Sequence, residues 1–201
     1  MISRKATRKN LVVISAPSGS GKTTVCRGLQ SLYPEWNFSL SLTTRPRRSY
    51  ERDGYDYTFA SEREFRQRVD RGEFVEYEEV HGHLYGTLRA TVERALETGE
   101  TLLLELDVKG GMAIKDAYPD NSVTVFIRPP SVEELRRRLR GRGSDTEAVI
   151  QTRLERMEME MANEEFYDYS VINEKVETTI EEIVRILNSE QSEVEGARHG
   201  N

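Results

Sequence analysis

Directly after four apolar residues, Leu11-Val12-Val13-Ile14, the sequence continues Ser15-Ala16-Pro17-Ser18-Gly19-Ser20-Gly21-Lys22-Thr23-Thr24. A buried strand that runs into a Gly-rich loop and then a helix directs several backbone N–H groups and the positive end of the helix dipole at one point. Gly19 and Gly21 permit the backbone conformations that such a loop needs. Lys22 supplies a mobile charge for the β- and γ-phosphates, and the Thr23 hydroxyl can coordinate Mg²⁺. The stretch therefore predicts an ATP site with Mg²⁺ as cofactor.

The loop departs from the usual P-loop pattern at its first position, where Ala16 replaces glycine. The alternative is a Ser/Gly-rich turn that binds nothing, but the position between a strand and a helix favours the phosphate site. The residues assigned to the ATP site here are Ala16, Pro17, Ser18, Gly19, Ser20, Gly21, Lys22, Thr23 and Thr24, with Thr23 as the metal ligand.

Length and composition indicate one α/β domain with insertions. The chain has 201 residues, a net charge of −6 and 32% charged residues, which disfavours a broad nucleic-acid-binding surface. A single cysteine, Cys26, excludes an intrachain disulfide and suits a reducing compartment. No apolar run is long enough to cross a bilayer, and the basic stretch 4–9 lacks the apolar segment of a signal peptide. A cytoplasmic protein that binds neither membrane nor nucleic acid is expected.

Short apolar runs alternate with helical patterns, as in a parallel sheet with helices on both faces. The expected strands are 11–15, 38–43, 101–106, 123–127 and 170–172. Capping boxes mark helix starts, each with a serine hydroxyl three residues before a glutamate. They are Ser61 with Glu64, Ser131 with Glu134 and Ser144 with Glu147.

About fifty residues separate the second and third of these strands, which is too long for a simple connection. The β-like runs 55–59 and 74–80 within this segment predict an inserted subdomain. From Ser189 onward the sequence has little apolar content, so a frayed tail is expected.

The second predicted strand ends in Ser41-Leu42-Thr43-Thr44-Arg45-Pro46-Arg47-Arg48, a concentration of hydroxyls and guanidiniums that suits a second phosphate site. A solvated Arg-rich turn is the alternative. Glu76, in Glu73-Phe74-Val75-Glu76-Tyr77, has two interpretations of equal weight. It is either a surface carboxylate or, with a hydroxyl, a complement to the N1–H, N2–H₂ and O6 edge of guanine.

From Leu11 to about Leu187 the chain resembles the guanylate kinases. The family's Pro-Ser-Gly-x-Gly-Lys loop corresponds to 17–22, its Ser-x-Thr-Thr-Arg-x-x-Arg run to 41–48 and its Asp-Gly-x-Asp-Tyr run to 53–57. The family's Glu-Phe-x-Glu-Tyr and Tyr-Gly-Thr elements correspond to 73–77 and 85–87. The resemblance implies a P-loop NTPase-type parallel sheet core with helices on both faces, a small mixed β GMP-binding subdomain and a helical Arg-rich lid.

The resemblance also implies approximate boundaries. The core covers about 10–37, 101–135 and 165–188, the GMP-binding subdomain about 38–100, the lid about 136–164 and the tail 189–201.

The resemblance implies a GMP site in two parts. The residues expected at the GMP phosphate are Arg45, Arg48, Tyr57 and Tyr85. Those expected around the guanine are Ser41, Glu76, Thr87 and Asp107. Asp107 closes an apolar strand, so a place near Mg²⁺ stays open for it as well. Two departures from the family pattern are Arg47, which stands where a proline is usual, and Lys109, which stands where a glutamine is usual.

Five arginines crowd the stretch Arg136-Arg137-Arg138-Leu139-Arg140-Gly141-Arg142. One interpretation is a charged helix that pairs with the preceding glutamates, and the other is a cationic lid that closes over the transferred phosphoryl group. The resemblance assigns three lid arginines to the ATP phosphates, and it places Asn173 near the adenine. The catalytic set expected is Lys22, Arg138, Arg142 and Arg153.

The resulting hypothesis is Mg²⁺-dependent transfer of the ATP γ-phosphoryl group to GMP, and also to dGMP, in purine nucleotide metabolism. Because the acceptor phosphate is already anionic, the reaction needs positioning and charge stabilisation rather than a strong base. Two alternatives remain: a kinase of another nucleoside monophosphate, and an inactive guanylate-kinase-like binding module. A monomer or a homodimer is expected.

Overall fold

A five-stranded parallel sheet forms the centre of the molecule. The computed structural model describes residues 9–80, 82–141 and 147–199. The sheet has the order β2-β7-β1-β8-β9. Its strands are β1 (Leu11–Ser15), β2 (Asn37–Phe38), β7 (Leu102–Leu106), β8 (Ser122–Arg128) and β9 (Tyr169–Ile172).

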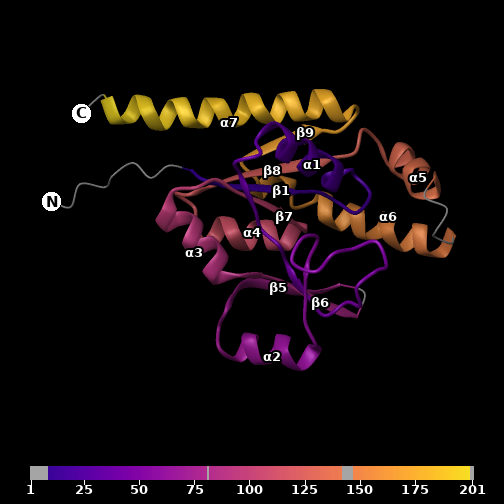
Figure 1. Cartoon of the computed structure of the whole chain (residues 1–201). Helices are drawn as coiled ribbons and strands as arrows, with labels where there is room; N and C mark the ends of the chain where they lie inside the picture. The colour runs from indigo at the N-terminus through magenta and orange to yellow at the C-terminus, as the bar shows by residue number, and fades with distance from the viewer. Residues whose placement is uncertain (1–8, 81, 142–146, 200–201) are drawn as a thin grey trace.

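Alternate side chains of the central strands enter two separate cores, as the pleat requires. Val12 and Ile14 pack with α1 (Lys22–Leu32) and α7 (Val176–His199) on one face. Leu11 and Val13 pack with α3 (Arg89–Thr98) and α4 (Val108–Ala117) on the other. Figure 1 shows the sheet between these two helical layers. The expected α/β fold with helices on both faces is therefore confirmed.

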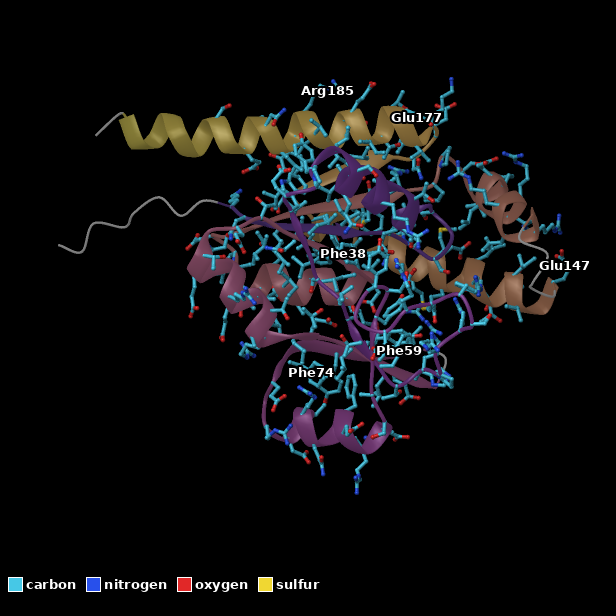
Figure 2. All side chains as sticks on the ribbon, viewed as in Figure 1. Phe38, Phe59, Phe74, Glu147, Glu177 and Arg185 are labelled. Atoms are coloured by element: carbon cyan, nitrogen blue, oxygen red, sulfur yellow. The ribbon has the colours of Figure 1, made fainter. Side chains whose placement is uncertain are left out.

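The inserted segment forms a second, mixed sheet of order β4-β3-β6-β5. Its elements are β3 (Leu42–Thr43), β4 (Thr58–Phe59), α2 (Glu62–Asp70), β5 (Phe74–Val80) and β6 (His83–Leu88). The Phe65 ring of α2 stacks on the Phe74 ring of β5, with centroids 4.5 Å apart. Figure 2 shows Phe74 between β5 and α2, in the small core of this unit.

The predicted strand 38–43 is wrong as a single element. Residues 37–38 pair with β7 of the large sheet, whereas 42–43 pair with β4 and β6 of the small one. The chain crosses between the sheets at 39–41, where Ser39 N–H still donates to Leu103 O and Thr58 N–H donates to Ser41 O. The apolar pattern predicts that these residues lie in strands, but it does not predict that the neighbouring strand changes between residues 38 and 42.

The segment expected as a lid, about 136–164, covers the second half of α5 (Val132–Gly141) and all of α6 (Glu147–Met161), and these helices pack on each other through their apolar faces. Leu135 and Leu139 of α5 meet Ile150, Leu154 and Met157 of α6. A short 3₁₀ turn, η1 (Glu164–Phe166), leads from α6 into β9. The capping box at Ser144 lies outside the described residues, whereas the one at Ser61 is present in full and Ser131 Oγ accepts from Glu134 N–H.

The tail differs from the expectation of a frayed segment, because α7 continues through Ser189 to His199. Glu190 explains the difference. Its carboxylate, nearly buried, accepts a 2.6 Å hydrogen bond from the Tyr169 hydroxyl and pairs with Lys9 Nζ at 2.8 Å. This contact fixes the helix to the sheet beyond Leu187, the last residue of α7 in the core. Among the described residues, no helix has the length and apolar character to cross a membrane.

Replacing Phe65 by alanine is expected to lower the free energy of unfolding by about 3–5 kcal/mol, because it empties the centre of the small core. Phe166→Ala is the matched control: Phe166 is 51% exposed, so its loss should cost less than about 1 kcal/mol. Urea denaturation of the three proteins measures both values. Equal losses from the two substitutions would contradict this assignment of the core.

Candidate functional site

The loop between β1 and α1 takes a conformation that depends on its glycines. Gly19 and Gly21 have φ of +92° and +94°, in the left-handed region that side chains disfavour. The space is also restricted, since a Cβ at Gly21 would lie 2.4 Å from Asn173 Nδ2. That amide donates a 2.7 Å hydrogen bond to Ser20 O, so the loop is held from below by the end of β9. Asn173 and Ser20 are buried and do not line the cavity described next.

A cavity of about 460 Å³, hereafter the main cavity, opens over this loop and reaches the second sheet. It brings together most of the candidate residues. Those on its wall are Ala16, Pro17, Ser18, Gly19, Gly21, Lys22, Thr23, Thr24, Ser41, Tyr57, Glu76, Tyr85, Asp107 and Arg153. The candidates that the structure describes away from the wall are Ser20, Arg45, Arg48, Thr87, Arg138 and Asn173. Arg142 lies outside the described residues.

The two functional side chains at the start of α1 are held against the end of β7. Lys22 Nζ donates to Leu106 O at 2.5 Å. The Thr23 hydroxyl donates to Glu105 Oε1, also at 2.5 Å. These contacts place the Lys22 ammonium at the end of β7, where the side-chain oxygens of Thr23 and Glu105 lie together.

Arg45 lies behind the far wall of the main cavity, where a buried carboxylate holds it. Glu51 accepts from Arg45 Nη2 at 2.7 Å and from Arg45 Nη1 at 3.0 Å, and it also accepts from Arg48 N–H at 2.8 Å. Arg45 Nε donates to the Tyr85 hydroxyl at 3.1 Å, and its guanidinium lies 5.3 Å from the centre of the Tyr57 ring. The bond from Arg45 lowers the pKa of Glu51, which is 5% exposed. The guanidinium is thus fixed behind the two tyrosines that line the wall.

Arg48 points to a neighbouring cavity of about 1060 Å³, hereafter the side cavity. Its Nη1 donates to the Tyr50 hydroxyl at 3.0 Å. The two cavities adjoin, because they share Thr23, Phe38, Asp56, Tyr57 and Glu105 on their walls. Arg47, in the place of the expected proline, donates to Glu51 O at 2.6 Å.

Glu76 supplies a carboxylate in a poorly solvated position on the wall. Its pKa is raised to about 7, mainly by burial and to a smaller extent by the nearby charge of Asp107. Thr87 is the cross-strand partner of Glu76 on β6 and is fully buried. Its hydroxyl lowers the pKa of Glu76 in part, although it forms no hydrogen bond of standard geometry. The close approach of α4 favours glycine, because a Cβ at Gly110 would lie 3.0 Å from Glu76 Oε2 and would push on that carboxylate. Asp107, which caps α4, accepts from Gly110 N–H at 2.7 Å.

The lid arginines described by the structure differ in position. Arg153 of α6 lines the main cavity. Arg138 of α5 does not, because its Nε donates to Glu134 Oε1 at 2.8 Å and its Nη2 donates to Asn173 O at 3.0 Å. In this conformation Arg138 therefore secures α5 to the segment that supports the Gly-rich loop.

Sequence reasoning missed five charged residues at the site: Glu51, Asp56, Glu105, Arg156 and Glu160. Glu105 stands two residues before Asp107 in an otherwise apolar strand, and this isolated charge was an available signal. Glu51 is one of many charges in its loop, and nothing local distinguishes it. Arg156, on the wall beside Glu160, follows Arg153 by one helical turn.

The main cavity thus has two ends of different chemistry. The Gly-rich loop, Lys22 and the Thr23–Glu105 pair suit a polyphosphate with a divalent cation. The far end offers Tyr57, Tyr85 and the guanidinium behind them for an anion, and Glu76 for a group with adjacent N–H donors. Two anionic ligands can lie head to head in one cavity.

Comparison with known proteins identifies the relationship. A sequence model of the guanylate kinase family, described as "Guanylate kinase", matches residues 8–190. The chain is 44% identical to a guanylate kinase of Thermotoga maritima over 184 residues, covering 92% of this chain and 88% of that one. It is 46% identical to a guanylate kinase of Syntrophotalea carbinolica over 180 residues, covering 90% and 85%. The crystal structure of guanylate kinase from Anaplasma phagocytophilum superposes with a TM-score of 0.74 at 32% identity, covering 92% and 87%.

Glu51→Gln is expected to lower the free energy of unfolding by about 2 kcal/mol at pH 7, because it removes the charge that Arg45 and Arg48 share. A folded-state pKa below the ordinary value means that Glu51 stabilises the protein above about pH 4.5 and loses this contribution as pH falls further. Denaturant titrations at pH 7 and pH 3 should therefore show the difference between mutant and wild type shrinking at pH 3. A difference of equal size at both pH values would contradict the role of the Glu51 charge.

Proposed function

Because this chain belongs to the guanylate kinase family, we propose that it transfers the γ-phosphoryl group of ATP to GMP, giving ADP and GDP. The observation that carries the proposal is one cavity with Lys22 and the Gly-rich loop at one end and Glu76 with Tyr57 and Tyr85 at the other. We also propose the division into a core (10–37, 101–135 and 165–188), a GMP-binding subdomain (38–100), whose last helix α3 packs on the central sheet, and a lid (136–164). A cytoplasmic location, a monomer or homodimer, and acceptance of dGMP stay predictions.

The donor end is proposed to hold the triphosphate of ATP. Backbone N–H groups of the loop 16–24, apart from Pro17, which has none, and from Ser20 and Thr24, which donate within the loop, are available to the phosphates, and Lys22 compensates the charge of the β- and γ-phosphates. Thr23 and Glu105 are suited to Mg²⁺, since both offer oxygen ligands. The described residues contain no group of three or more His, Cys, Asp or Glu side chains arranged for a metal. A cation with few protein ligands and a shell completed by water and phosphate fits this pair; bound there, it would neutralise charge on the transferred group.

The acceptor end of the cavity is proposed to bind both the phosphate and the base of GMP. Arg45, Arg48, Tyr57 and Tyr85 bind the phosphate, with Arg45 held ready by Glu51. Around the base, the proposed residues are Ser41, Glu76, Thr87 and Asp107. Ionised Glu76 accepts from guanine N1–H and N2–H₂, two donors that adenine does not present together.

Catalysis then consists of positioning and charge stabilisation. The GMP phosphate oxygen attacks the γ-phosphorus in line while the bond to the β-phosphate oxygen breaks, and the charge of the transferred group faces Lys22 and Arg153. Arg138 and Arg142 are proposed to join them when the lid closes. On closure, Arg138 is proposed to exchange its contacts with Glu134 and Asn173 for contacts with phosphate oxygens. Closure also excludes water, which would otherwise hydrolyse ATP.

A panel of GMP, AMP, CMP and UMP with Mg·ATP tests the function. We expect kcat/KM for GMP to exceed that for AMP by about 10⁴, because a site that pairs two base donors rejects a base without them. Preference for another monophosphate would favour the first alternative. Failure to form GDP while GMP still binds would favour the inactive binding module.

The pKa of Glu76 predicts a pH dependence of GMP binding. With a pKa of about 7 in the free protein, the carboxyl is mostly protonated at pH 6 and mostly ionised at pH 8. Because only the carboxylate accepts both guanine donors, GMP affinity should rise roughly tenfold over this range. Calorimetric titration with GMP at several pH values measures it.

Glu76→Gln is the control for this pH dependence. It should weaken GMP binding by about a hundredfold and retain only the pH dependence that arises from the GMP phosphate. An identical pH profile in Glu76→Gln and wild type would show that another group titrates.

A further inference from the structure

Five charged side chains meet at one edge of the main cavity, where α6, β5 and α4 come together. They are Glu78, Asp107, Lys109, Arg156 and Glu160, hereafter the edge cluster. Arg156 Nε donates to Glu160 Oε1 on its own helix at 2.7 Å, and Arg156 Nη2 lies 3.9 Å from Glu78 Oε1 of β5. Lys109 Nζ of α4 lies 3.1 Å from the same Glu78 oxygen.

Arg156 occupies a particular place on α6. It follows Arg153 by three residues, so the two lie on the same side of the helix, and both line the main cavity. Arg153 is the arginine proposed to act on the transferred phosphoryl group. A contact that holds Arg156 in place therefore also limits how far Arg153 can move from the acceptor end of the cavity.

Glu78 occupies the matching place on β5. It follows Glu76 by two residues, so both side chains project from the same face of the strand. Burial raises the pKa of Glu78, the adjacent Asp107 raises it further, and Lys109 opposes the rise. Two cations therefore share this carboxylate in a partly desolvated position, where an ion pair is screened less than at the surface.

The apolar contacts of α6 that the structure describes are with α5 and, through Met161, with the cluster of Val108, Phe126 and Tyr167, whereas its contact with β5 is made by charged side chains. Leu154 and Met157 pack against Leu135 and Leu139 of α5, which secures α6 to the other lid helix. Arg156 instead extends to Glu78, in the strand that carries Glu76. One ion pair thus joins the helix of Arg153 to the wall proposed for guanine.

We propose that Arg156 is a positioning residue that, by pairing with Glu78, holds α6 and Arg153 over the acceptor end of the main cavity. The proposal rests on the proposed function. Lys109 has no such role, because it reaches the same carboxylate from α4 and its side chain is 80% exposed. The arrangement couples the strand that recognises the base to the helix that stabilises the transferred charge.

The experiment measures kcat and KM of the full chain with Arg156→Gln, Glu78→Gln and the double variant. Each single substitution should lower kcat about fivefold, and the double variant should be no slower than either single, since all three lack the same pair. KM for ATP should stay within about twofold, because the Gly-rich loop is untouched. Arg156→Lys, which keeps the charge, should recover most of the lost kcat.

Lys109→Gln is the matched control, since it removes the other cation from Glu78 without touching α6, and it should change kcat less than about twofold. The proposal is overturned if Arg156→Gln equals wild type, if the effects of the two single substitutions multiply in the double variant, or if Lys109→Gln is as slow as Arg156→Gln. Thermal melting of each variant checks folding, and Glu78→Gln tests the pair from the other side if Arg156→Gln is unstable. A wild-type chain that fails to phosphorylate GMP would instead contradict the proposed function.

Discussion

The site depends on two left-handed glycines in the loop after β1. Gly19 and Gly21 have no side chain to strain the turn, and the space that a side chain would fill is taken by other parts of the molecule. A Cβ at Gly19 would lie 2.8 Å from Leu135 of α5, and one at Gly21 would meet Asn173 at the end of β9. The loop is therefore a junction where the strand, the lid and the sheet edge fix one another.

A second constraint acts at the acceptor end, where charged side chains must be in position before a ligand binds. Glu51 keeps the guanidinium of Arg45 at the back of the cavity, so a phosphate meets an arginine that has already lost its conformational freedom. Glu76 differs from Arg45 in its environment. Its carboxyl is poorly solvated and half protonated near pH 7, which leaves hydrogen-bonding capacity for a base with adjacent donors. A prepositioned arginine and a poorly solvated carboxyl at the same end of the cavity suit recognition of a nucleoside monophosphate.

Much of this arrangement could be predicted from the sequence because its signals are local. The apolar run before residues 16–24, the alternating pattern of 74–80 and the capping box at Ser61 each indicate structure within a few residues, and the described elements agree with them. The division of 38–43 between two sheets could not be predicted, since strand partners are set by tertiary packing. Arg156 and the buried Glu190 escaped for the same reason, because each gains its role from a partner on another element, whereas Glu51 escaped because its loop holds many charges and nothing in the sequence tells which of them pair.

The central claim is that ATP and GMP occupy opposite ends of one cavity with their phosphates head to head. Calorimetric titration with a dinucleotide in which adenosine and guanosine are joined through five phosphates tests it most directly. The account predicts one binding site per chain, affinity well above that of either nucleotide alone, displacement by both ATP and GMP, and weakening by both Lys22→Ala and Glu76→Gln. Displacement by only one of the two nucleotides, or insensitivity to either substitution, would contradict a shared cavity.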